Sequence, residues 1–311
     1  MPWSELLSLR ERLDDAPLAE WYEALLARAG QQPLRLALLG GRLASTPGRA
    51  FLAGYQAALR ALWPAAPPSL GALCVTEQRS VRPADMQTRL DGLTLTGNKD
   101  FVTAAEAADW LLVAAREEPA GAAPRIALAV LYAGAPGVVL QGLPGMPLLA
   151  DIPHARLRLQ QAHCERLPGD GWAEYCKPFR SLEDLYVLCA LHAWLLGVAQ
   201  QCAWPQALQL RVLSLLAGCA EVARQPASDA AGHLLLAGLF AQQEALSADI
   251  DAAFASSPPA WQQLWQRDRA VLAPRRPPRA DERQPRRERH RPAAPAGQEA
   301  HGAGGERVAQ I

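Results

Sequence analysis

The chain has 311 residues, of which half are apolar, with 31 basic and 31 acidic residues and no formal net charge. Such a length allows two or three domains with sizeable cores. The balanced charge excludes a general attraction to nucleic acid or to an anionic membrane surface, so we expect neither as a partner. The six cysteines form no C-x-x-C pair and fit no zinc pattern, which favours a reduced, cytoplasmic protein without a metal site.

Residues 1–68 are predicted to form an N-terminal helical domain. Apolar residues recur at helical spacing in four short segments. The third segment begins at Pro33 and ends near Leu43, and the fourth runs to Trp63 after Thr46 and Pro47, a suitable N-cap and first helical residue. The stretch Pro64–Pro68 ends this domain.

Residues 69–168 change to the period of β-strands. The segments that alternate or form short apolar runs are 71–77, 93–96, 110–115, 125–132, 137–140 and 155–159. Asp91-Gly92 is a hairpin signal before the second of them. Six or seven short strands at this spacing are typical of a small antiparallel barrel or sandwich, and we expect the barrel.

Residues 169–273 return to the helical period and predict a C-terminal helical bundle. Its first helix is expected from Leu182 to Cys202, with Ser181 as N-cap. Formal charge is absent from Leu185 to Trp204, and we interpret this stretch as a buried core helix rather than a membrane span. Further helices are expected at about 205–223, 226–254 and 259–272.

Residues 274–311 are rich in arginine and proline and carry almost no large aliphatic side chains. Such a segment cannot bury enough apolar area to fold, so it is predicted to be a disordered tail. It is either a basic arm or a degenerate remnant of a last helix. The fold class is therefore α+β: N-terminal helices, a small central β-barrel, a C-terminal helical bundle and a tail.

Short segments at the joints of this plan resemble the acyl-CoA dehydrogenase family. In chain order, they are Cys74-Val-Thr-Glu77, Leu95-Thr-Gly-Asn-Lys-Asp-Phe-Val-Thr103, Ala108-Asp-Trp-Leu-Leu-Val113, Gly134-Ala-Pro-Gly-Val138, Leu167-Pro-Gly-Asp-Gly-Trp172 and Leu196-Gly-Val-Ala199. Each match is weak alone, but the six keep the family's order over residues 70–200. The chain is identified as a shortened, divergent member of that family.

The resemblance implies an FAD site at the inner edge of the barrel. Val75 and Thr76 would supply backbone and hydroxyl contacts, Phe101 would lie against the flavin ring, and Thr103 would donate a hydrogen bond near it. A flavin ring needs such a flat apolar wall with a few donors. The alternative is that these are ordinary strand and core residues.

The family's glycine-rich phosphate turn is missing. The corresponding residues are Gln78-Arg-Ser-Val-Arg-Pro83, in which Ser80 is the candidate for the phosphate-binding serine, but no glycine flanks it. Arg79 and Arg82 are candidates for a phosphate contact or are solvated loop residues. The family's later arginine motif is also lost, and Arg211 is a poor substitute.

Family members oxidise an acyl-CoA thioester with a carboxylate base, and this chain lacks the usual position for it. Glu183, on the first C-terminal helix, is the candidate base, and Asp184 is a weaker one. The alternative is that both acids only stabilise the first turn of that helix. His192 in the same helix is interpreted as a core or interface residue.

Three functions remain open. The chain is an FAD-dependent acyl-CoA dehydrogenase-like enzyme, a catalytically inactive relative that serves as a structural or partner subunit, or an unrelated helical interaction protein without a barrel. We expect a homodimer or homotetramer, because the large apolar side chains of the C-terminal helices exceed what a thin bundle can bury; they are Trp194, Leu195, Leu213, Leu215 and Leu216.

Overall fold

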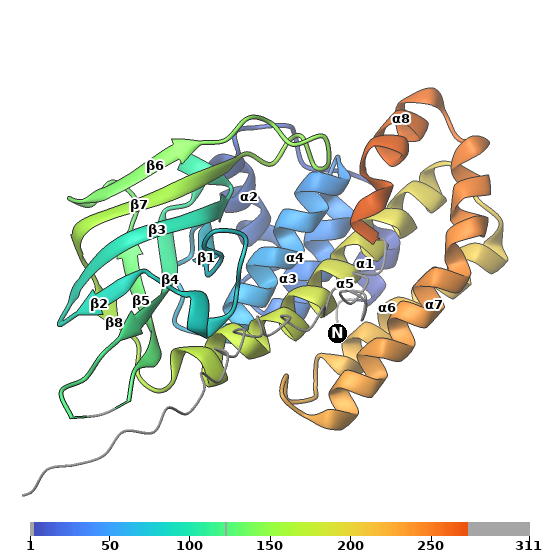
Figure 1. Cartoon of the computed structure of the whole chain (residues 1–311). Helices are drawn as coiled ribbons and strands as arrows, with labels where there is room; N and C mark the ends of the chain where they lie inside the picture. The colour runs from blue at the N-terminus through green and yellow to red at the C-terminus, as the bar shows by residue number, and fades with distance from the viewer. Residues whose placement is uncertain (1–2, 122, 273–311) are drawn as a thin grey trace, which may run out of the picture. The chain divides into compact units, whose positions relative to one another are not determined.

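Four helices open the chain, and three of them match the predicted positions (Figure 1). The computed structural model describes residues 3–121 and 123–272. Helices α2, α3 and α4 span Leu18–Ala29, Pro33–Leu43 and Pro47–Leu62. Helix α1 spans only Trp3–Ser8. Beyond α1 the chain crosses the end of α3, where the Leu13 N–H donates to the Leu43 carbonyl at 2.8 Å.

The middle of the chain is an eight-stranded sheet. Its strands are β1 (Gly71–Cys74), β2 (Arg89–Asp91), β3 (Thr94–Thr103), β4 (Trp110–Glu117), β5 (Arg125–Tyr132), β6 (Val138–Gly142), β7 (His154–His163) and β8 (Glu165–Arg166). They are ordered β6-β7-β3-β2-β4-β5-β8, and β1 pairs with β4 beside β2. The hairpin predicted at Asp91-Gly92 joins β2 to β3, with Gly92 at a φ of +56°.

The prediction of a small antiparallel β-barrel is confirmed only in part. In the part of the chain that the structure describes, the sheet curls but ends at β6 on one side and β8 on the other, so it is a half-barrel (Figure 1). Strand β8 has two residues and pairs with β5 only at Ala129 and Val130. Closure requires strands that pair around the whole circumference, and this edge is too short to provide that. Two of the β4 pairings, with β1 and β2, are parallel rather than antiparallel.

The two faces of the sheet belong to two cores. On β4, Trp110, Leu112 and Ala114 join the large core shared with the helices, whereas Leu111, Val113 and Ala115 fill the inside of the curl. This alternation follows from the two-residue period of a strand. One face of the sheet is therefore covered by the helical layer, and any site between sheet and helices must lie on that face.

The C-terminal helices are α5 (Lys177–Gln201), α6 (Gln206–Val222), α7 (Ala230–Ala255) and α8 (Pro259–Asp268). Helix α5 packs against both α3 and α4. The helical segment from Gly171 to Gln201 is long and apolar enough to cross a membrane, but 83% of its most apolar window is buried inside the protein. This burial agrees with the interpretation as a core helix. The predicted tail, 274–311, lies outside the described residues.

Candidate functional site

A β-bulge in β3 turns two predicted site residues toward the helices. The pairing of β3 with β7 shifts register between Lys99 and Val102. Val102 lies in the core inside the curl, so its neighbours Phe101 and Thr103 point to the opposite face. Bulges commonly re-aim side chains in this way. Phe101 remains 44% exposed, which leaves its ring available to a ligand on the helical side.

Thr103 is hydrogen-bonded to Tyr55, a buried residue of α4. Tyr55, on α4, is 3% exposed, and its hydroxyl accepts a hydrogen bond from the Leu73 N–H at 2.8 Å. Burial raises the pKa of Tyr55 far above its ordinary value, hydrogen bonds from Leu73 and Thr103 act against this, and the charge of Glu183 adds to it. The phenol is therefore neutral, it is hydrogen-bonded to the Thr103 hydroxyl, and Glu183 is near enough for its charge to act on it.

Aromatic rings surround this meeting point. The Phe179 ring, at the start of α5, meets the Tyr55 ring edge-on with 5.7 Å between centroids, and Phe51 stacks on Tyr55 at 6.1 Å. The sequence analysis missed Tyr55 and Phe179, because no local pattern connects α4 with a helix that begins more than a hundred residues later. The predicted residue Glu183 acts on Tyr55 through its charge; Ser80 is not among the residues around Tyr55.

Val75 and Thr76 lie just beyond the end of β1. The Val75 side chain packs against the helical core, on the same face as Phe101 and Thr103. The Thr76 carbonyl accepts from the Asp100 N–H at 2.9 Å, which holds the segment against the bulge of β3. Three of the predicted ring contacts, Val75, Phe101 and Thr103, are therefore on one face of two adjacent segments.

A buried ion pair fixes these two segments to each other. Lys99 Nζ lies 2.5 Å from Glu77 Oε1 and 3.3 Å from the Val75 carbonyl oxygen, and both charged side chains are almost fully buried. The Glu77 carboxylate also accepts from the N–H groups of Gln87 and Thr88. Burial alone would raise the pKa of Glu77, but Lys99 and these donors outweigh burial and hold it below the usual range. Both residues occur in the quoted motifs, yet the sequence analysis gave them no role.

The turn that corresponds to the phosphate loop is closed on itself. Gln78 and Arg79 have φ of +48° and +64°, and Glu77 and Ser80 exchange two backbone hydrogen bonds of 2.9 and 2.7 Å. This is a type I′ turn, built here without glycine. The Arg79 N–H donates to Asp100 Oδ2 at 2.7 Å. The amides of this turn are thus already engaged by the protein.

The Ser80 hydroxyl is engaged as well. It donates to Asp85 Oδ2 at 2.7 Å and accepts from the Arg82 N–H at 3.2 Å. The donor set that would be needed to cradle a pyrophosphate is therefore used for internal contacts. Arg211 makes its ion pair elsewhere: its guanidinium pairs with Asp249 on α7.

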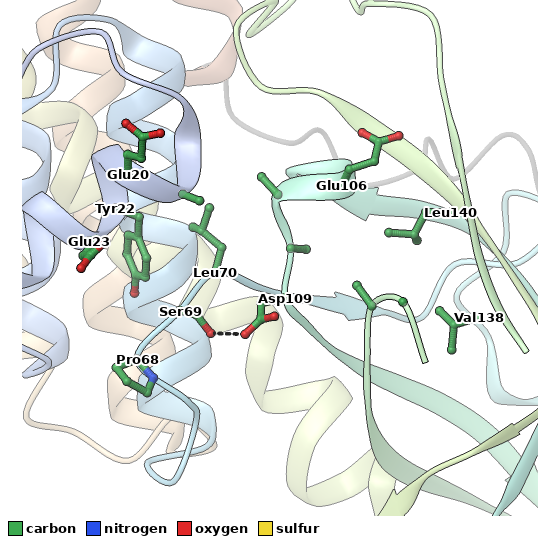
Figure 2. Close-up of a pocket in the computed structure, with 15 residues that line it drawn as sticks. Glu20, Tyr22, Glu23, Pro68, Ser69, Leu70, Glu106, Asp109, Val138 and Leu140 are labelled. Atoms are coloured by element: carbon green, nitrogen blue, oxygen red, sulfur yellow. Dashed lines mark hydrogen bonds between the residues drawn. The ribbon is translucent and has the colours of Figure 1, made fainter. Parts of the chain in front are cut away.

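A hollow of about 810 Å³ lies between α2 and the sheet (Figure 2). Glu20 and Glu23 line its helical side, Glu106 and Asp109 line its sheet side, and Leu70, Val138 and Leu140 contribute apolar surface. Ser69 donates to Asp109 at 2.8 Å. Carboxylates on both walls, without a lysine or arginine among the described lining residues, make this hollow unsuited to the phosphates of a nucleotide.

Helix α5 begins earlier than predicted, and this changes the position of Glu183. Asp170 is the cap: its carboxylate accepts from the N–H groups of Trp172 and Ala173, and a turn of π-helix over Gly171–Cys176 leads into α5. Ser181 therefore lies inside the helix, and its prediction as N-cap is wrong. Glu183 is past the first turn of α5, so a favourable interaction with the start of the helix no longer accounts for it.

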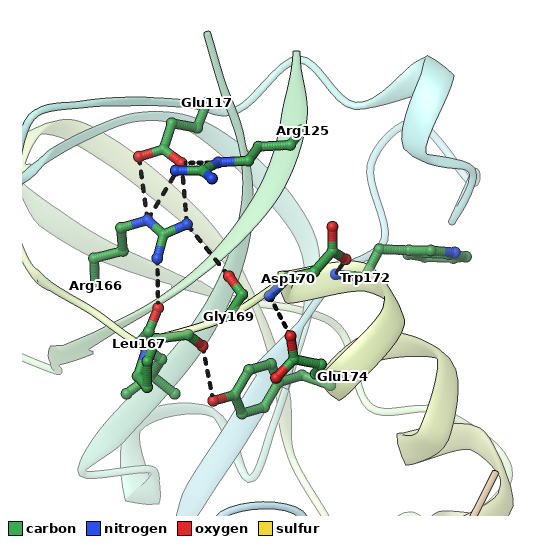
Figure 3. Close-up of polar contacts among 10 residues, drawn as sticks. Glu117, Arg125, Arg166, Leu167, Gly169, Asp170, Trp172 and Glu174 are labelled. Atoms are coloured by element: carbon green, nitrogen blue, oxygen red, sulfur yellow. Dashed lines mark hydrogen bonds and ion pairs between the residues drawn. The ribbon is translucent and has the colours of Figure 1, made fainter. Parts of the chain in front are cut away.

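A set of polar contacts holds the chain where it leaves the sheet for α5 (Figure 3). Glu117 on β4 pairs with both Arg125 and Arg166, and Arg166 also donates to the carbonyls of Leu167 and Gly169. The start of α5 is anchored to the strands at this point.

Helices α3 and α4 touch the backbone of α5 directly. A Cβ on Gly41 would overlap the Ala190 carbonyl, and one on Gly54 would lie 2.6 Å from the Tyr186 carbonyl oxygen. Contacts this close leave no space for an aliphatic ligand between these helices at those two positions. Over the described ranges, 3–121 and 123–272, no group of three or more acidic, histidine or cysteine side chains is placed to hold a metal ion.

Comparison with known proteins supports the fold. No protein-family model and no curated protein sequence matches this chain. Among solved structures, FMN-bound TdsC from Paenibacillus sp. A11-2 aligns with a TM-score of 0.59 at 13% identity, over 80% of this chain and 83% of that chain. Butyryl-CoA dehydrogenase from Megasphaera elsdenii aligns with a TM-score of 0.57 at 13% identity, over 84% and 88%. An FAD-dependent dehydrogenase aligns with 0.51 at 14%, over 74% and 73%.

These likenesses confirm the resemblance deduced from the six segments. The chain has the fold of the acyl-CoA dehydrogenase-like flavoproteins in a divergent form. At such low identity the comparisons establish the fold and leave the site to be argued from its own residues.

Proposed function

We propose that this protein binds a flavin on the helical face of β1 and β3 and oxidises an acyl-CoA-type thioester there. The observation that carries the proposal is the hydrogen bond of Thr103 on β3 with the buried Tyr55 on α4, with Glu183 of α5 near enough for its charge to raise the pKa of Tyr55. Removal of an α-proton next to a flavin requires a flat apolar surface for the flavin ring and a carboxylate base beside it.

The residues present fit the ring of a flavin better than its phosphates. Val75 and the exposed Phe101 provide an apolar surface, and the hydroxyls of Thr76 and Thr103 provide donors. The turn at Ser80 offers a pyrophosphate little, because its amides and hydroxyl are engaged. We keep FAD as the proposed cofactor and expect it to be held mainly by its ring. A bound flavin would supply the hydride acceptor.

Within this proposal, Glu183 takes the α-proton of the substrate on a carboxylate oxygen. The neutral phenol of Tyr55 and the ring of Phe179 limit water near that carboxylate. The Thr103 hydroxyl, which donates to the Tyr55 oxygen in this structure, turns its hydrogen to the ligand on the strand side. Because Glu183 lies beyond the first turn of α5, its position is set by the packing of α5 on α4 rather than by the helix terminus.

The test is the visible absorption spectrum of the purified full-length protein before and after incubation with FAD, followed by desalting. A retained flavin spectrum is expected. Acyl-CoA should then bleach the flavin in wild type, and Glu183→Gln should slow bleaching by at least about 100-fold. Glu244→Gln, which changes an exposed carboxylate on α7, is the matched control and should bleach like wild type. A protein that stays colourless with FAD contradicts the proposal.

The second candidate function is a catalytically inactive structural or partner subunit. The closed turn at Ser80 and the direct contacts of α3 and α4 with α5 favour it. A flavin-free protein that nonetheless assembles stably with a second chain would favour this candidate over the first.

We also propose that the chain assembles as a homodimer or homotetramer. The C-terminal helices bury more of their apolar side chains than the sequence predicts: Trp194, Leu195, Leu215 and Leu216 are buried within the chain itself. The support now comes from α7, which exposes Leu234 by 76% and Leu235 by 46%. Exposed leucines this large on a helix are typical of a contact surface.

A further inference from the structure

Three arginines gather where the N-terminal segment crosses the ends of two helices. Arg10 and Arg12 follow α1, and Arg42 lies in the last turn of α3. All three reach the amides of Gln200 and Gln201, the last residues of α5. The flavin proposal uses none of them.

Arg42 is the buried member of this arginine cluster. Its side chain is completely inaccessible to solvent, and only its Nη2 is bonded, to the Leu9 carbonyl and to Gln200 Oε1. Its Nε and Nη1 have no hydrogen-bond partner among the residues that the structure describes. A buried guanidinium with two unpaired nitrogens is costly, and native proteins rarely leave one so.

Arg12 and Arg10 are bonded only to uncharged groups. Arg12 donates to the Ala44 carbonyl and, from Nε and Nη2, to Gln201 Oε1 at 3.3 and 3.1 Å. Arg10 donates to backbone carbonyls of α1 and its end, and to Gln200. Among the residues the structure describes, no ion pair joins any of the three arginines to a carboxylate. The thirteen ion pairs of these residues include most other arginines of the helices and strands.

Gly197 makes room for two of the guanidiniums side by side. A Cβ at this position would lie 2.8 Å from Arg42 Nη1 and 3.3 Å from Arg12 Nη2. Gly197 belongs to the Leu196–Ala199 segment, which has no role in the proposed flavin site. The pKa of Arg12 and that of Arg42 are each lowered to about 10, mainly by burial and in part by repulsion from Arg42 and from Arg10, respectively.

Capping of helix ends explains only part of this cluster. Arginine side chains often donate to the last carbonyls of a helix, as Arg12 does at Ala44. Capping does not account for three like charges kept together with no carboxylate paired to them among the described residues. A bound anion would supply the counter-charge.

We propose that Arg10, Arg12 and Arg42 form a binding site for a phosphate-type oxyanion. The exposed Arg10 and the half-buried Arg12 contact the anion from the solvent side, and Arg42 adds its charge from beneath, next to Gly197. Guanidinium groups suit this ligand because their planar donors match a phosphate in pairs. The ring of Trp261, 4.7 Å from the Arg12 guanidinium carbon, holds Arg12 in place by a cation–π contact.

The test is thermal unfolding of the full-length protein in sodium phosphate and in sodium chloride of equal ionic strength at pH 7.5. Phosphate should raise the wild-type Tm by about 3 °C at ten times its dissociation constant, and with the logarithm of its concentration above that. Arg12→Gln should lose this shift. Arg10→Gln, which alters an exposed side chain and does not endanger folding, should weaken phosphate binding by at least about 5-fold. Arg224→Gln, at an exposed arginine paired with Glu221, should respond like wild type.

Two sources of phosphate are distinguished by a second titration with 5′-AMP. Tighter binding of AMP than of inorganic phosphate, lost in Arg12→Gln, supports a nucleotide phosphate as the ligand; equal binding supports free phosphate. The proposal is overturned if phosphate acts no more strongly than chloride, or if the Arg10 and Arg12 variants respond as wild type does. Because Glu183→Gln should leave the phosphate response unchanged, this result is independent of the flavin proposal.

Discussion

Lys99 Nζ and Glu77 Oε1 lie 2.5 Å apart, and this ion pair joins β3 to the segment that follows β1 without access to solvent. The same lysine also holds the Val75 carbonyl. The pair therefore sets the spacing of the two segments that carry the proposed flavin wall.

Glu77→Gln should destabilise the protein by about 3–5 kcal/mol, because it leaves the buried Lys99 charge without a counter-charge. Urea unfolding measures the free energy of unfolding. Glu118→Gln, in a largely exposed pair with Arg89 and Arg116, should cost less than about 1 kcal/mol. Joint replacement of Glu77 by Gln and Lys99 by Met should cost less than the sum of the single changes; simple additivity would show that the pair is not coupled.

His192 should make the protein acid-sensitive. It is fully buried between α5 and α7, bonded to the Leu188 carbonyl and the Gln243 side chain, and burial lowers its pKa from 6.5 to about 4. Between these two values the unfolded chain binds a proton that the folded chain does not. Stability should therefore fall as pH drops from 6.5 toward 4, by about 3 kcal/mol in total.

Urea unfolding at pH 7.5, 6, 5 and 4.5 measures this dependence. The difference between wild type and His192→Gln isolates the contribution of His192, because all other groups titrate in both proteins. Parallel curves for the two proteins would show that His192 keeps an ordinary pKa.

Gly54→Ala should destabilise the protein by about 2–3 kcal/mol or more, because the new methyl group meets the backbone of α5 at the Tyr186 carbonyl. The matched control is Gly238→Ala in α7, where a Cβ meets nothing within 4 Å. That change should stabilise by about 0.5–1 kcal/mol through helix propensity. Thermal or urea unfolding of both variants suffices, and a neutral Gly54→Ala would show that α4 and α5 are not in rigid contact.

Leu234→Glu together with Leu235→Glu should convert an assembly into monomers, because two charges would be buried in the proposed α7 contact. Light scattering during size-exclusion chromatography measures the mass. Leu93→Glu, at an exposed leucine of the β2–β3 hairpin, should leave the mass unchanged. A wild-type mass of one chain would reject the assembly altogether.

The sequence was informative about helices whose limits are set locally. Pro33 and Thr46-Pro47 mark the starts of α3 and α4 where the structure has them, since a cap needs only neighbouring residues. The start of α5 was predicted wrongly because Ser181 imitates a cap, whereas Asp170 is the residue that bonds the free amides. Closure of the sheet depends on pairing between distant strands, which no local pattern reveals.

The residues of the candidate site were likewise predictable only where their signal is local. Phe101 and Thr103 were found from a contiguous segment, and the bulge that aims them was not, because it appears only in the register with β7. Tyr55 and Arg42 give no signal in the sequence. Their importance comes from α5, which meets them from far along the chain.

The close contacts of α3 and α4 with α5 also have a consequence for synthesis. Helix α4 ends at Leu62 and α5 begins at Lys177, so the N-terminal helices leave the ribosome well before the helix that covers them. At roughly 5–20 residues per second this interval is about 6–20 s. During that time the glycine- and leucine-rich face of α3 and α4 is open to water, and a nascent chain in this state is a substrate for chaperones that hold apolar surface.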